Sequence, residues 1–323
     1  MLTEILKTLK AERRKIVFTE GEDVRILEAA AHLKKDDIMD VVLCGDPEKI
    51  TAAAKNGGFN IDGIEIVNPL NYPGIDAMVN KMVELRKGKM TADDCRTALK
   101  KSNYFGTMYV KMGFADGLLG GATYSTADTV RPALQIIKTK PGNKIVSSCF
   151  ILSRETASGT EKYAMADCAI NIAPQEDDLV EIATETARTA RYFGIDPKVA
   201  MLSYSSKGSG KGESVDMMRN AAEKVKALNP DFEVDGELQF DAAFAPEVAA
   251  TKAKDSKVAG HANTFVFPDI NAGNIGYKIA QRLGGFDAYG PILQGLNAPI
   301  NDLSRGCNAD EVYTMAIITL GLK

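Results

Sequence analysis

Histidine is almost absent from this sequence of 323 residues, and cysteine is sparse. The chain has two histidines and five cysteines, and no two cysteines form a CxxC pair. A zinc site and a disulfide framework are therefore not expected, and no metal is predicted. Because histidine is so scarce, acid–base chemistry falls mainly to carboxylates, lysines and tyrosines. The scattered cysteines fit a reducing compartment, so we expect the protein in the cytoplasm.

Long apolar runs and an excess of basic residues are also missing. No apolar run approaches the ~18 residues of a membrane-spanning helix, so no membrane partner is expected. The N-terminal MLTEILKTLKAERRK lacks the apolar core and cleavage site of a signal peptide, and is typical of a short amphipathic helix. The net charge of −4 argues against a general nucleic-acid binder, which needs a basic patch to neutralise phosphates.

What the chain does contain is an alternation of strand and helix patterns. Helical spacing of apolar residues covers 24–35 and 177–194, for example. Strand patterns occupy residues 15–21, 40–45, 115–120, 144–150, 198–204 and 263–269. This alternation predicts an α/β protein with mostly parallel sheets. In such sheets ligands bind beyond the carboxyl ends of the strands, so functional residues are expected in the loops that follow strands.

Two polar connectors divide the sequence. Its length exceeds one typical compact core, which favours two α/β domains. KTKPGNK (138–144) and GLNAPIND (295–302) have the Pro/Gly composition of hinges. We therefore predict a first domain of residues 1–141 plus 299–323, and a second domain of residues 142–298.

A glycine- and lysine-rich loop, SSKGSGKGES, occupies residues 205–214. It fails the residue count of both the P-loop and the G-x-G-x-x-G fingerprint, so it does not predict ATP or NAD binding. Its backbone N–H groups, with Lys207 and Lys211, could still line an anionic ligand.

The stretch FPDINAGNIGYK (267–278) follows a strand pattern and begins a helical one. Asp269 or Asn271 can cap the helix. Gly273 permits close approach of either another backbone or a ligand. A capped, tightly packed helix explains this stretch as well as a binding site does.

Three arginines stand in separate segments: Arg25 in TEGEDVR, Arg86 in VELRKGK and Arg131 in TVRPALQ. A lone arginine usually lies on a solvated surface. Arg131 has few charged neighbours and is the least surface-like of the three. Because the planar guanidinium suits bidentate binding of phosphate, all three are candidates for anion binding.

The stretch INDLSRGCNADE (300–311) combines a serine, an arginine and several carboxylates. Asn308 and Glu311 fit an N-terminal capping box for the apolar helix that follows. Ser304 and Arg305 therefore lie just before a helix N-terminus, where backbone N–H groups favour anions. No histidine or G-x-S-x-G motif surrounds Ser304, so a hydrogen-bond donor is indicated more strongly than a nucleophile.

Several blocks together resemble the short form of the phosphate acetyltransferases, within the phosphate acetyl/butyryltransferase family. The resemblance spans the chain, and its most specific blocks are TEGEDVRILEAA, ADGLLGGATYSTADTVRPALQ, VDGELQFDAA, FPDINAGNIGYK and GPILQGLNAPINDLSRGC. It implies reversible acetyl transfer between coenzyme A and inorganic phosphate, with acetyl-CoA and acetyl phosphate as the other substrates. It also implies two domains with an interdomain cleft, as in isocitrate and isopropylmalate dehydrogenases, a homodimer, and no permanently bound cofactor.

The resemblance also assigns roles to residues of this sequence. Ser304 and Arg305 match the catalytic serine and arginine of the family, and Arg86 and Arg131 match arginines of the phosphate side. Arg25 matches an arginine implicated with coenzyme A. Asn271 and Gly273, in the block 267–278, are also expected on the coenzyme A side.

The catalytic carboxylate departs from the family pattern. Seven residues after Ser304 stands Glu311, where the family has aspartate, and Asp310 precedes it. We prefer Glu311 as the base because of its position and retain Asp310 as the alternative. The chemistry expected from these residues is direct attack of the coenzyme A thiolate on acetyl phosphate in a ternary complex.

Three other functions remain open from the sequence. A phosphate butyryltransferase, or a variant for another acyl length, would use the same chemistry, because one methylene changes binding by only ~1–3 kcal/mol. A decarboxylating dehydrogenase of the same fold would need a dinucleotide and usually a cluster of metal-binding carboxylates, and neither pattern is found. A non-catalytic paralogue is disfavoured by the presence of Ser304, Arg305 and a nearby acid.

Overall fold

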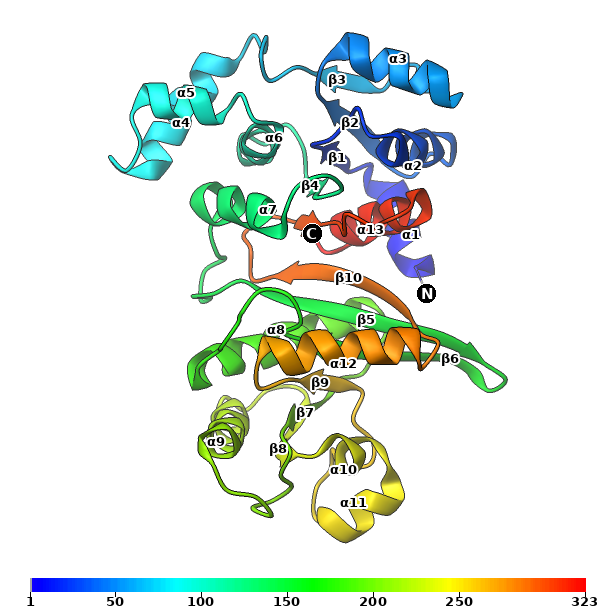
Figure 1. The fold of residues 1–323 in the computed structure, drawn as a ribbon, viewed down its shortest axis with the longest axis vertical. Helices are drawn as coiled ribbons and strands as arrows, with labels where there is room; N and C mark the ends of the chain where they lie inside the picture. The colour runs from blue at the N-terminus through cyan, green and yellow to red at the C-terminus, as the bar shows by residue number, and fades with distance from the viewer. Residues whose placement is uncertain (1) are drawn as a thin grey trace. The chain divides into compact units, whose positions relative to one another are not determined.

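The computed structural model describes residues 2–323, and these form two compact units. Unit 1 comprises Met1–Pro141 and Leu296–Lys323, and unit 2 comprises Gly142–Gly295. Each unit is built on one β-sheet with helices packed on its faces (Figure 1). The mixed α/β class and the mostly parallel sheets predicted from the sequence are confirmed.

Unit 1 holds a five-stranded sheet in the order β11-β4-β1-β2-β3, and every neighbouring pair is parallel. Its strands are β1 (Lys15–Phe18), β2 (Asp40–Cys44), β3 (Glu65–Val67), β4 (Gly117–Gly120) and β11 (Ile300–Asp302). Its helices are α1 (Thr3–Glu12), α2 (Val24–Lys35), α3 (Pro47–Gly57), α4 (Ile75–Arg86), α5 (Ala92–Ala98), α6 (Ser102–Lys111), α7 (Thr126–Pro132), the π-helical turn η1 (Ala133–Ile137) and α13 (Ala309–Gly321).

The core of unit 1 explains why these segments fold. Side chains of α4, α6 and η1 pack on β1 and β4 in one cluster of buried residues, which includes Phe105, Met108 and Ile136. Helix α13 contacts α1, α2 and the strand β4. Its apolar sequence is buried from Val312 to Leu320 except at Tyr313 and Thr314, so the C-terminal helix is held firmly in unit 1.

Unit 2 holds a six-stranded sheet in the order β10-β5-β6-β9-β7-β8. Its elements are β5 (Ser147–Thr156), β6 (Gly159–Ala166), α8 (Glu176–Tyr192), β7 (Lys198–Leu202), α9 (Glu213–Ala227), β8 (Glu233–Leu238), α10 (Phe240–Phe244), α11 (Pro246–Lys252), β9 (Thr264–Val266), α12 (Ile270–Arg282) and β10 (Asp287–Gln294). Strands β6, β9, β7 and β8 are parallel, whereas β5 pairs antiparallel with both β6 and β10.

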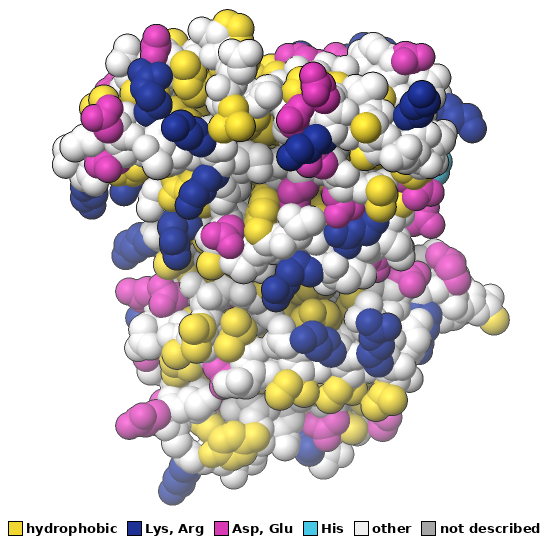
Figure 2. All heavy atoms as spheres, turned by 45° about the horizontal axis from the view of Figure 1, so that its top comes forward, with side chains coloured by type: hydrophobic (Ala, Val, Ile, Leu, Met, Phe, Trp, Pro, Cys, Tyr) yellow, Lys and Arg dark blue, Asp and Glu magenta, His cyan; other side chains and the backbone are white. Residues whose placement is uncertain are grey.

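All six strands expected from the sequence occur, but five others were not expected: β3, β6, β8, β10 and β11. Helix α2 has the bounds expected for residues 24–35, because Asp23 accepts the N–H of Arg25 as its cap. On the face that Figure 2 shows, basic and acidic side chains are interspersed. Within residues 2–323, no helix is long and apolar enough to cross a membrane.

Candidate active site

Three loops of unit 1 meet at the carboxyl edge of its sheet. Strands β1, β4 and β11 are neighbours and run in parallel, so the loops that follow them leave from the same edge. These loops carry Glu20 after β1, Thr123 after β4 and Ser304 after β11. Glu20 accepts the backbone N–H groups of Ala122 (2.9 Å) and Thr123, which joins the first loop to the second.

The segment Ser304–Cys307 forms a tight turn after β11. The N–H of Leu303 donates to the carbonyl of Gly120 (2.7 Å), and the N–H of Cys307 donates to the carbonyl of Ser304 (2.9 Å). Ser304, Arg305 and Gly306 are exposed. The Ser304 Oγ accepts the N–H of Gly306 at 3.3 Å, while its own hydrogen has no acceptor among residues 2–323. The hydroxyl is therefore available to donate to a ligand.

The capping box predicted for α13 is confirmed. The Asn308 side chain accepts the N–H of Glu311 (2.9 Å), and the Glu311 Oε2 accepts the N–H of Asn308 (3.1 Å). This geometry turns the Glu311 carboxylate back towards the turn, where its charge helps to raise the pKa of the Cys307 thiol after the larger effect of burial. Asp310 is exposed and has no hydrogen bond within the described chain.

Most arginines of this chain are already paired with a carboxylate. Of twelve arginines in the sequence, eight form ion pairs. Among residues 2–323, the four without such a pair are Arg86, Arg131, Arg282 and Arg305. Three of these four are the arginines expected on the phosphate side. Sequence reasoning gave no signal for the fourth, Arg282, on the last turn of α12.

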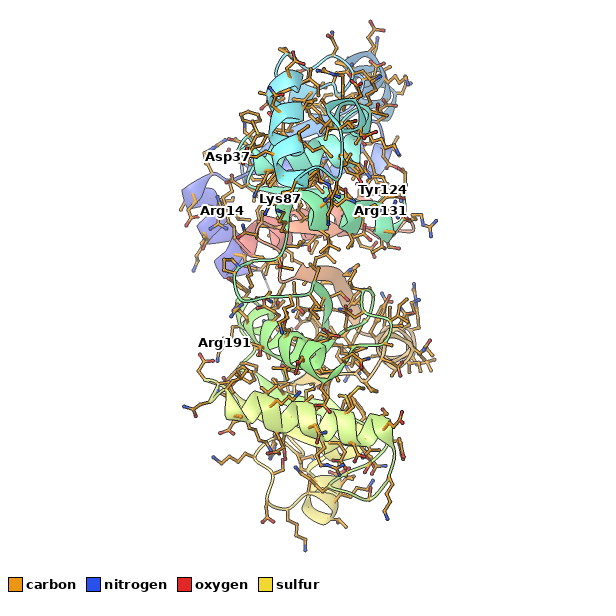
Figure 3. All side chains as sticks on the ribbon, turned by 90° about the vertical axis from the view of Figure 1, so that its left-hand side faces the viewer. Arg14, Asp37, Lys87, Tyr124, Arg131 and Arg191 are labelled. Carbon is orange, nitrogen blue, oxygen red and sulfur yellow. The ribbon has the colours of Figure 1, made fainter. Side chains whose placement is uncertain are left out.

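The three unpaired arginines of unit 1 differ in their surroundings. Arg305 lies on the turn itself, and Arg131 lies exposed on α7, labelled in Figure 3. Arg86 ends α4, and its Nε is buried without a hydrogen-bond partner in the described structure. A buried N–H without an acceptor costs ~1–3 kcal/mol, so the Nε of Arg86 is a donor that the described chain leaves unsatisfied.

Arg25, in contrast, is fully engaged by protein groups. Its Nε donates to Asp23 Oδ1 (2.9 Å), and its Nη2 donates to Asp23 Oδ2 (2.7 Å) and to the carbonyl of Ala122 (2.9 Å). Its Nη1 donates to the carbonyls of Arg305 (2.8 Å) and Cys307 (3.1 Å). The pairing raises the pKa of Arg25 and holds that of Asp23 below its usual range.

Asp302 is a residue of this site that the sequence did not single out. It ends β11 and is almost fully buried, and its two oxygens accept the hydroxyls of Thr126 (2.6 Å) and Thr129 (2.5 Å) from α7. Burial raises the pKa of Asp302 to about 6, against the opposing effect of these hydrogen bonds. Gly121 has a φ of +99°, and a Cβ there would lie 2.3 Å from Asp302 Oδ1. Asp302 thus ties the helix of Arg131 to the strand that precedes Ser304.

The remaining expected residues lie in unit 2. Asn271 is exposed in the first turn of α12, where Asp269 caps the helix by accepting the N–H groups of Asn271 and Ala272. Gly273 is a packing residue, because a Cβ there would lie 2.2 Å from the carbonyl oxygen of Asp167. The close-packing explanation of Gly273 is therefore supported.

The loop 205–214 is organised by internal contacts. The Lys207 Nζ pairs with Asp235 (2.5 Å), and the N–H of Gly208 donates to Glu237 (2.7 Å). The N–H of Gly210 donates to Ser205 Oγ (2.8 Å). The donors of Lys207, Gly208 and Gly210 are therefore already engaged by protein groups, which argues against an anion site at these three residues.

A cavity of about 540 Å³ opens at the carboxyl edge of the unit 1 sheet, beside Glu20, Lys49, Lys100 and Thr123. A larger cavity, of about 1070 Å³, lies in unit 2 at the amino ends of β7 and β8. In proteins with parallel sheets, ligands bind beyond the carboxyl ends of the strands. The smaller cavity is therefore better placed than the larger one to bind a substrate. Among residues 2–323, no cluster of three or more metal-binding side chains is found.

Comparison with known proteins adds what geometry alone does not give. A family model described as phosphate acetyl/butaryl transferase matches residues 1–320. A phosphate acetyltransferase of Bacillus subtilis (strain 168) is 55% identical over 305 residues, which cover 94% of this chain and 93% of that protein. A phosphate acetyltransferase of Staphylococcus epidermidis is 49% identical over 99% of this chain and 97% of its own length.

Solved structures agree with these relatives. The crystal structure of a phosphotransacetylase from Streptococcus pyogenes is 55% identical and superimposes with a TM-score of 0.96, covering 99% of this chain and 97% of that one. A branched-chain phosphotransacylase from Enterococcus faecalis is 20% identical with a TM-score of 0.67, covering 96% of this chain and 98% of that one. At that identity the second likeness concerns the fold alone.

Proposed function

The chain belongs to the phosphate acetyl/butaryl transferase family, and we propose that its turn Ser304–Cys307 is where an acetyl group passes directly between coenzyme A and inorganic phosphate. The observation that carries this proposal is the set of unpaired arginines, Arg86, Arg131 and Arg305, in the unit that holds Ser304. Guanidinium groups without carboxylate partners have donors available for an anionic ligand, and their planar fork suits the oxygens of phosphate.

The three arginines are proposed to bind the phosphate of acetyl phosphate and the phosphate that leaves. A guanidinium can donate two parallel hydrogen bonds to a phosphoryl group, which fixes both its position and its orientation. Asp302 supports this arrangement because its bonds to Thr126 and Thr129 hold α7, and with it Arg131, against β11.

Ser304 is proposed to stabilise the carbonyl oxygen that becomes negatively charged during transfer. Its hydroxyl hydrogen is uncommitted, and the turn lies before the N-terminus of α13, where the helix dipole favours negative charge. One preorganised donor of this kind is commonly worth about 3 kcal/mol of transition-state stabilisation. Because Ser304 only donates, it needs no histidine to activate it.

Glu311 is proposed as the base that takes the proton of the coenzyme A thiol. A free thiol has a pKa of about 8.5, so it needs a base to form the attacking thiolate at neutral pH. The sulfur then bonds to the acetyl carbon, the bond from that carbon to the phosphate oxygen breaks, and phosphate leaves. Glu311 is preferred over the alternative, Asp310, because it stands seven residues after Ser304 and its capping bond to Asn308 places its carboxylate beside the turn.

Coenzyme A is proposed to bind as a substrate, with Asn271 and Gly273 of α12 on its side and no permanently bound cofactor. Arg25 was expected on the same side, but protein groups already accept all five of its N–H donors. The two compact units are proposed to be the two domains expected from the sequence.

We also propose a homodimer in the cytoplasm. All five cysteines are free thiols, which is compatible with a reducing compartment. Ile275, Ile279 and Leu283 recur every four residues along α12 and its C-cap and are all exposed, so they form an apolar stripe that a second copy could cover. Light scattering of the purified protein would test the dimer, and Ile279→Glu should convert it to a monomer if the stripe is the interface.

Isotope exchange tests direct transfer. With labelled phosphate and acetyl phosphate but no coenzyme A, an enzyme that forms an acetyl-enzyme would exchange label between the two, whereas direct transfer predicts no exchange. Intact-protein mass spectrometry under the same conditions should show no gain of an acetyl group. Either exchange or acetylation would refute the scheme.

Substrate length and the arginine roles need separate assays. Thioester absorbance with acetyl-CoA and butyryl-CoA, with and without phosphate, distinguishes the acetyl activity from the butyryl alternative and from a non-catalytic paralogue. Membership of an acyltransferase family removes the dehydrogenase alternative. Arg131→Ala and Arg305→Ala should weaken phosphate saturation or turnover, whereas Arg96→Ala, which breaks an exposed ion pair with Asp76, should change neither.

A further inference from the structure

All three loops of the candidate site contact one side chain, Arg25. A guanidinium has five N–H donors, and in Arg25 each of the five has a protein acceptor. Two donors go to the carboxylate of Asp23, which belongs to the loop after β1. One goes to the carbonyl of Ala122 after β4, and two go to the carbonyls of Arg305 and Cys307 after β11.

To bind Arg25, a phosphate group of coenzyme A would have to displace some of these protein acceptors. The Arg25 side chain is 25% exposed and that of Asp23 only 14%, so their ion pair is largely shielded from water. To bind a phosphate, Arg25 would release either Asp23 or the backbone of the catalytic turn. Arg86, Arg131 and Arg305 face no such cost, because none has a carboxylate partner in residues 2–323.

We infer that Arg25 is a positioning residue for the turn Ser304–Cys307, and that it acts on the transfer step through this turn. The inference rests on the function proposed for Ser304 and Arg305. Arg25 donates hydrogen bonds to two carbonyls of the turn, those of Arg305 and Cys307, which lie on either side of Gly306. Fixing these two peptide groups fixes the direction of the Arg305 side chain and of the Ser304 hydroxyl.

Within residues 2–323, Arg25 is the side chain that donates to the carbonyls of Arg305 and Cys307, and no other does so. Leu303 is anchored to β4 through its backbone, and Asn308 begins the capping box of α13, but residues 304–306 between them are exposed. A misplacement of about 1 Å at a reacting group can cost 10²-fold in rate. Lysine cannot make the same set of hydrogen bonds, because its single ammonium group lacks the planar fork with which a guanidinium donates to three loops at once.

Steady-state kinetics of Arg25→Ala and Arg25→Lys distinguish positioning from binding. We expect kcat to fall at least thirtyfold in Arg25→Ala, while KM for coenzyme A and for acetyl-CoA changes less than threefold. Guanidinium ion at tens of millimolar should restore part of the kcat of Arg25→Ala and none of the kcat of Ser304→Ala. Arg96→Ala is the matched control and should behave as the wild type. A tenfold rise in KM for coenzyme A with kcat nearly unchanged would overturn the inference.

The thiol of Cys307 gives a second readout that needs no substrate. Cys307 is 6% exposed, and its Sγ lies 3.7 Å from Arg25 Nη1. We expect iodoacetamide to alkylate Cys307 at least tenfold faster in Arg25→Ala, while Cys44, buried in the same unit, reacts as in the wild type. If Cys307 reacts no faster, Arg25 does not hold the turn.

Two outcomes are thereby kept apart. If both cysteines accelerate in Arg25→Ala, the variant has unfolded, and Arg25→Lys then decides by the same two criteria. If Ser304→Ala and Arg305→Ala keep full turnover, the proposed chemistry of the turn fails, whatever Arg25 does to Cys307.

Discussion

The buried carboxyl of Asp302 should make unit 1 less stable as the pH rises. Its pKa is raised to about 6, mainly by burial, whereas an unfolded aspartate has a pKa of about 3.9. Between these two values the unfolded chain has lost the proton that the folded chain still holds. The folded state is therefore favoured below about pH 4, and this contribution is lost as the pH rises through 6.

Asp302→Asn measures this contribution, because asparagine keeps the shape and stays neutral. The threonine hydroxyls at 126 and 129 can rotate to donate to its oxygen or to accept from its nitrogen. From the two pKa values, the raised pKa of Asp302 lowers the free energy of unfolding of the wild type, relative to its value at low pH, by about 1 kcal/mol at pH 4.5 and by about 3 kcal/mol at pH 7.5. The stability of Asp302→Asn relative to wild type should therefore increase by about 2 kcal/mol over this range.

Hydrogen exchange of β11 and α7, corrected for intrinsic rates and followed by mass spectrometry of their peptides, gives the local free energy of opening at each pH. This measurement reports the stability of unit 1 by itself, whereas a global melting curve would combine the unfolding of both units. Asp310→Asn removes a charge from an exposed position nearby and controls for net charge. A difference between Asp302→Asn and wild type that stays flat from pH 4.5 to 7.5 would refute the reasoning.

Three further outcomes follow from the same contacts. Gly273→Ala should lower stability by about 1–3 kcal/mol, because its methyl group would overlap the carbonyl of Asp167; an unchanged Tm would contradict this. Glu311→Gln should lower kcat by about 10²–10⁴-fold as expected for loss of a general base, with Asp310→Asn much less affected, and the reverse order would reassign the base to Asp310. Asp235→Asn should lower the free energy of unfolding by about 1 kcal/mol at pH 7, because two partly exposed lysines, Lys207 and Lys226, oppose the burial of Asp235 and lower its pKa to about 2. This loss of stability should shrink as the pH falls from 4 towards 2. A loss that stays constant with pH in thermal-shift measurements would rule out the ion pairs as its source.

Local sequence patterns determined the features of this protein that need only neighbouring residues. Apolar runs bounded by turns predicted six strands, helical spacing predicted residues 24–35 of α2, and Asn308 marked the start of α13. The capping box of Asn308 and Glu311 was predictable because its members are three residues apart. The position of Ser304 before a helix N-terminus followed from the same motif.

The strands that sequence reasoning missed are short, polar or paired in an unexpected direction. Strand β11 has three residues, and β6 begins with exposed polar residues and pairs antiparallel with β5. Their identity as strands depends on hydrogen bonds to partners far along the chain, such as those between β11 and β4. Such pairing is not encoded in any local window.

Tertiary structure alone decided which charged groups are committed. Arg131 was expected to be the least surface-like of the three arginines, and this was wrong: it is exposed and has no carboxylate partner in the described structure, whereas Arg25 is half-buried and donates to three loops. Asp302 looks like an ordinary loop aspartate, yet the packing of α7 on β11 buries it and raises its pKa. The sequence supplied most of the candidate residues, whereas only the fold decided their burial and hydrogen-bond partners, because these depend on groups that lie tens to hundreds of residues away.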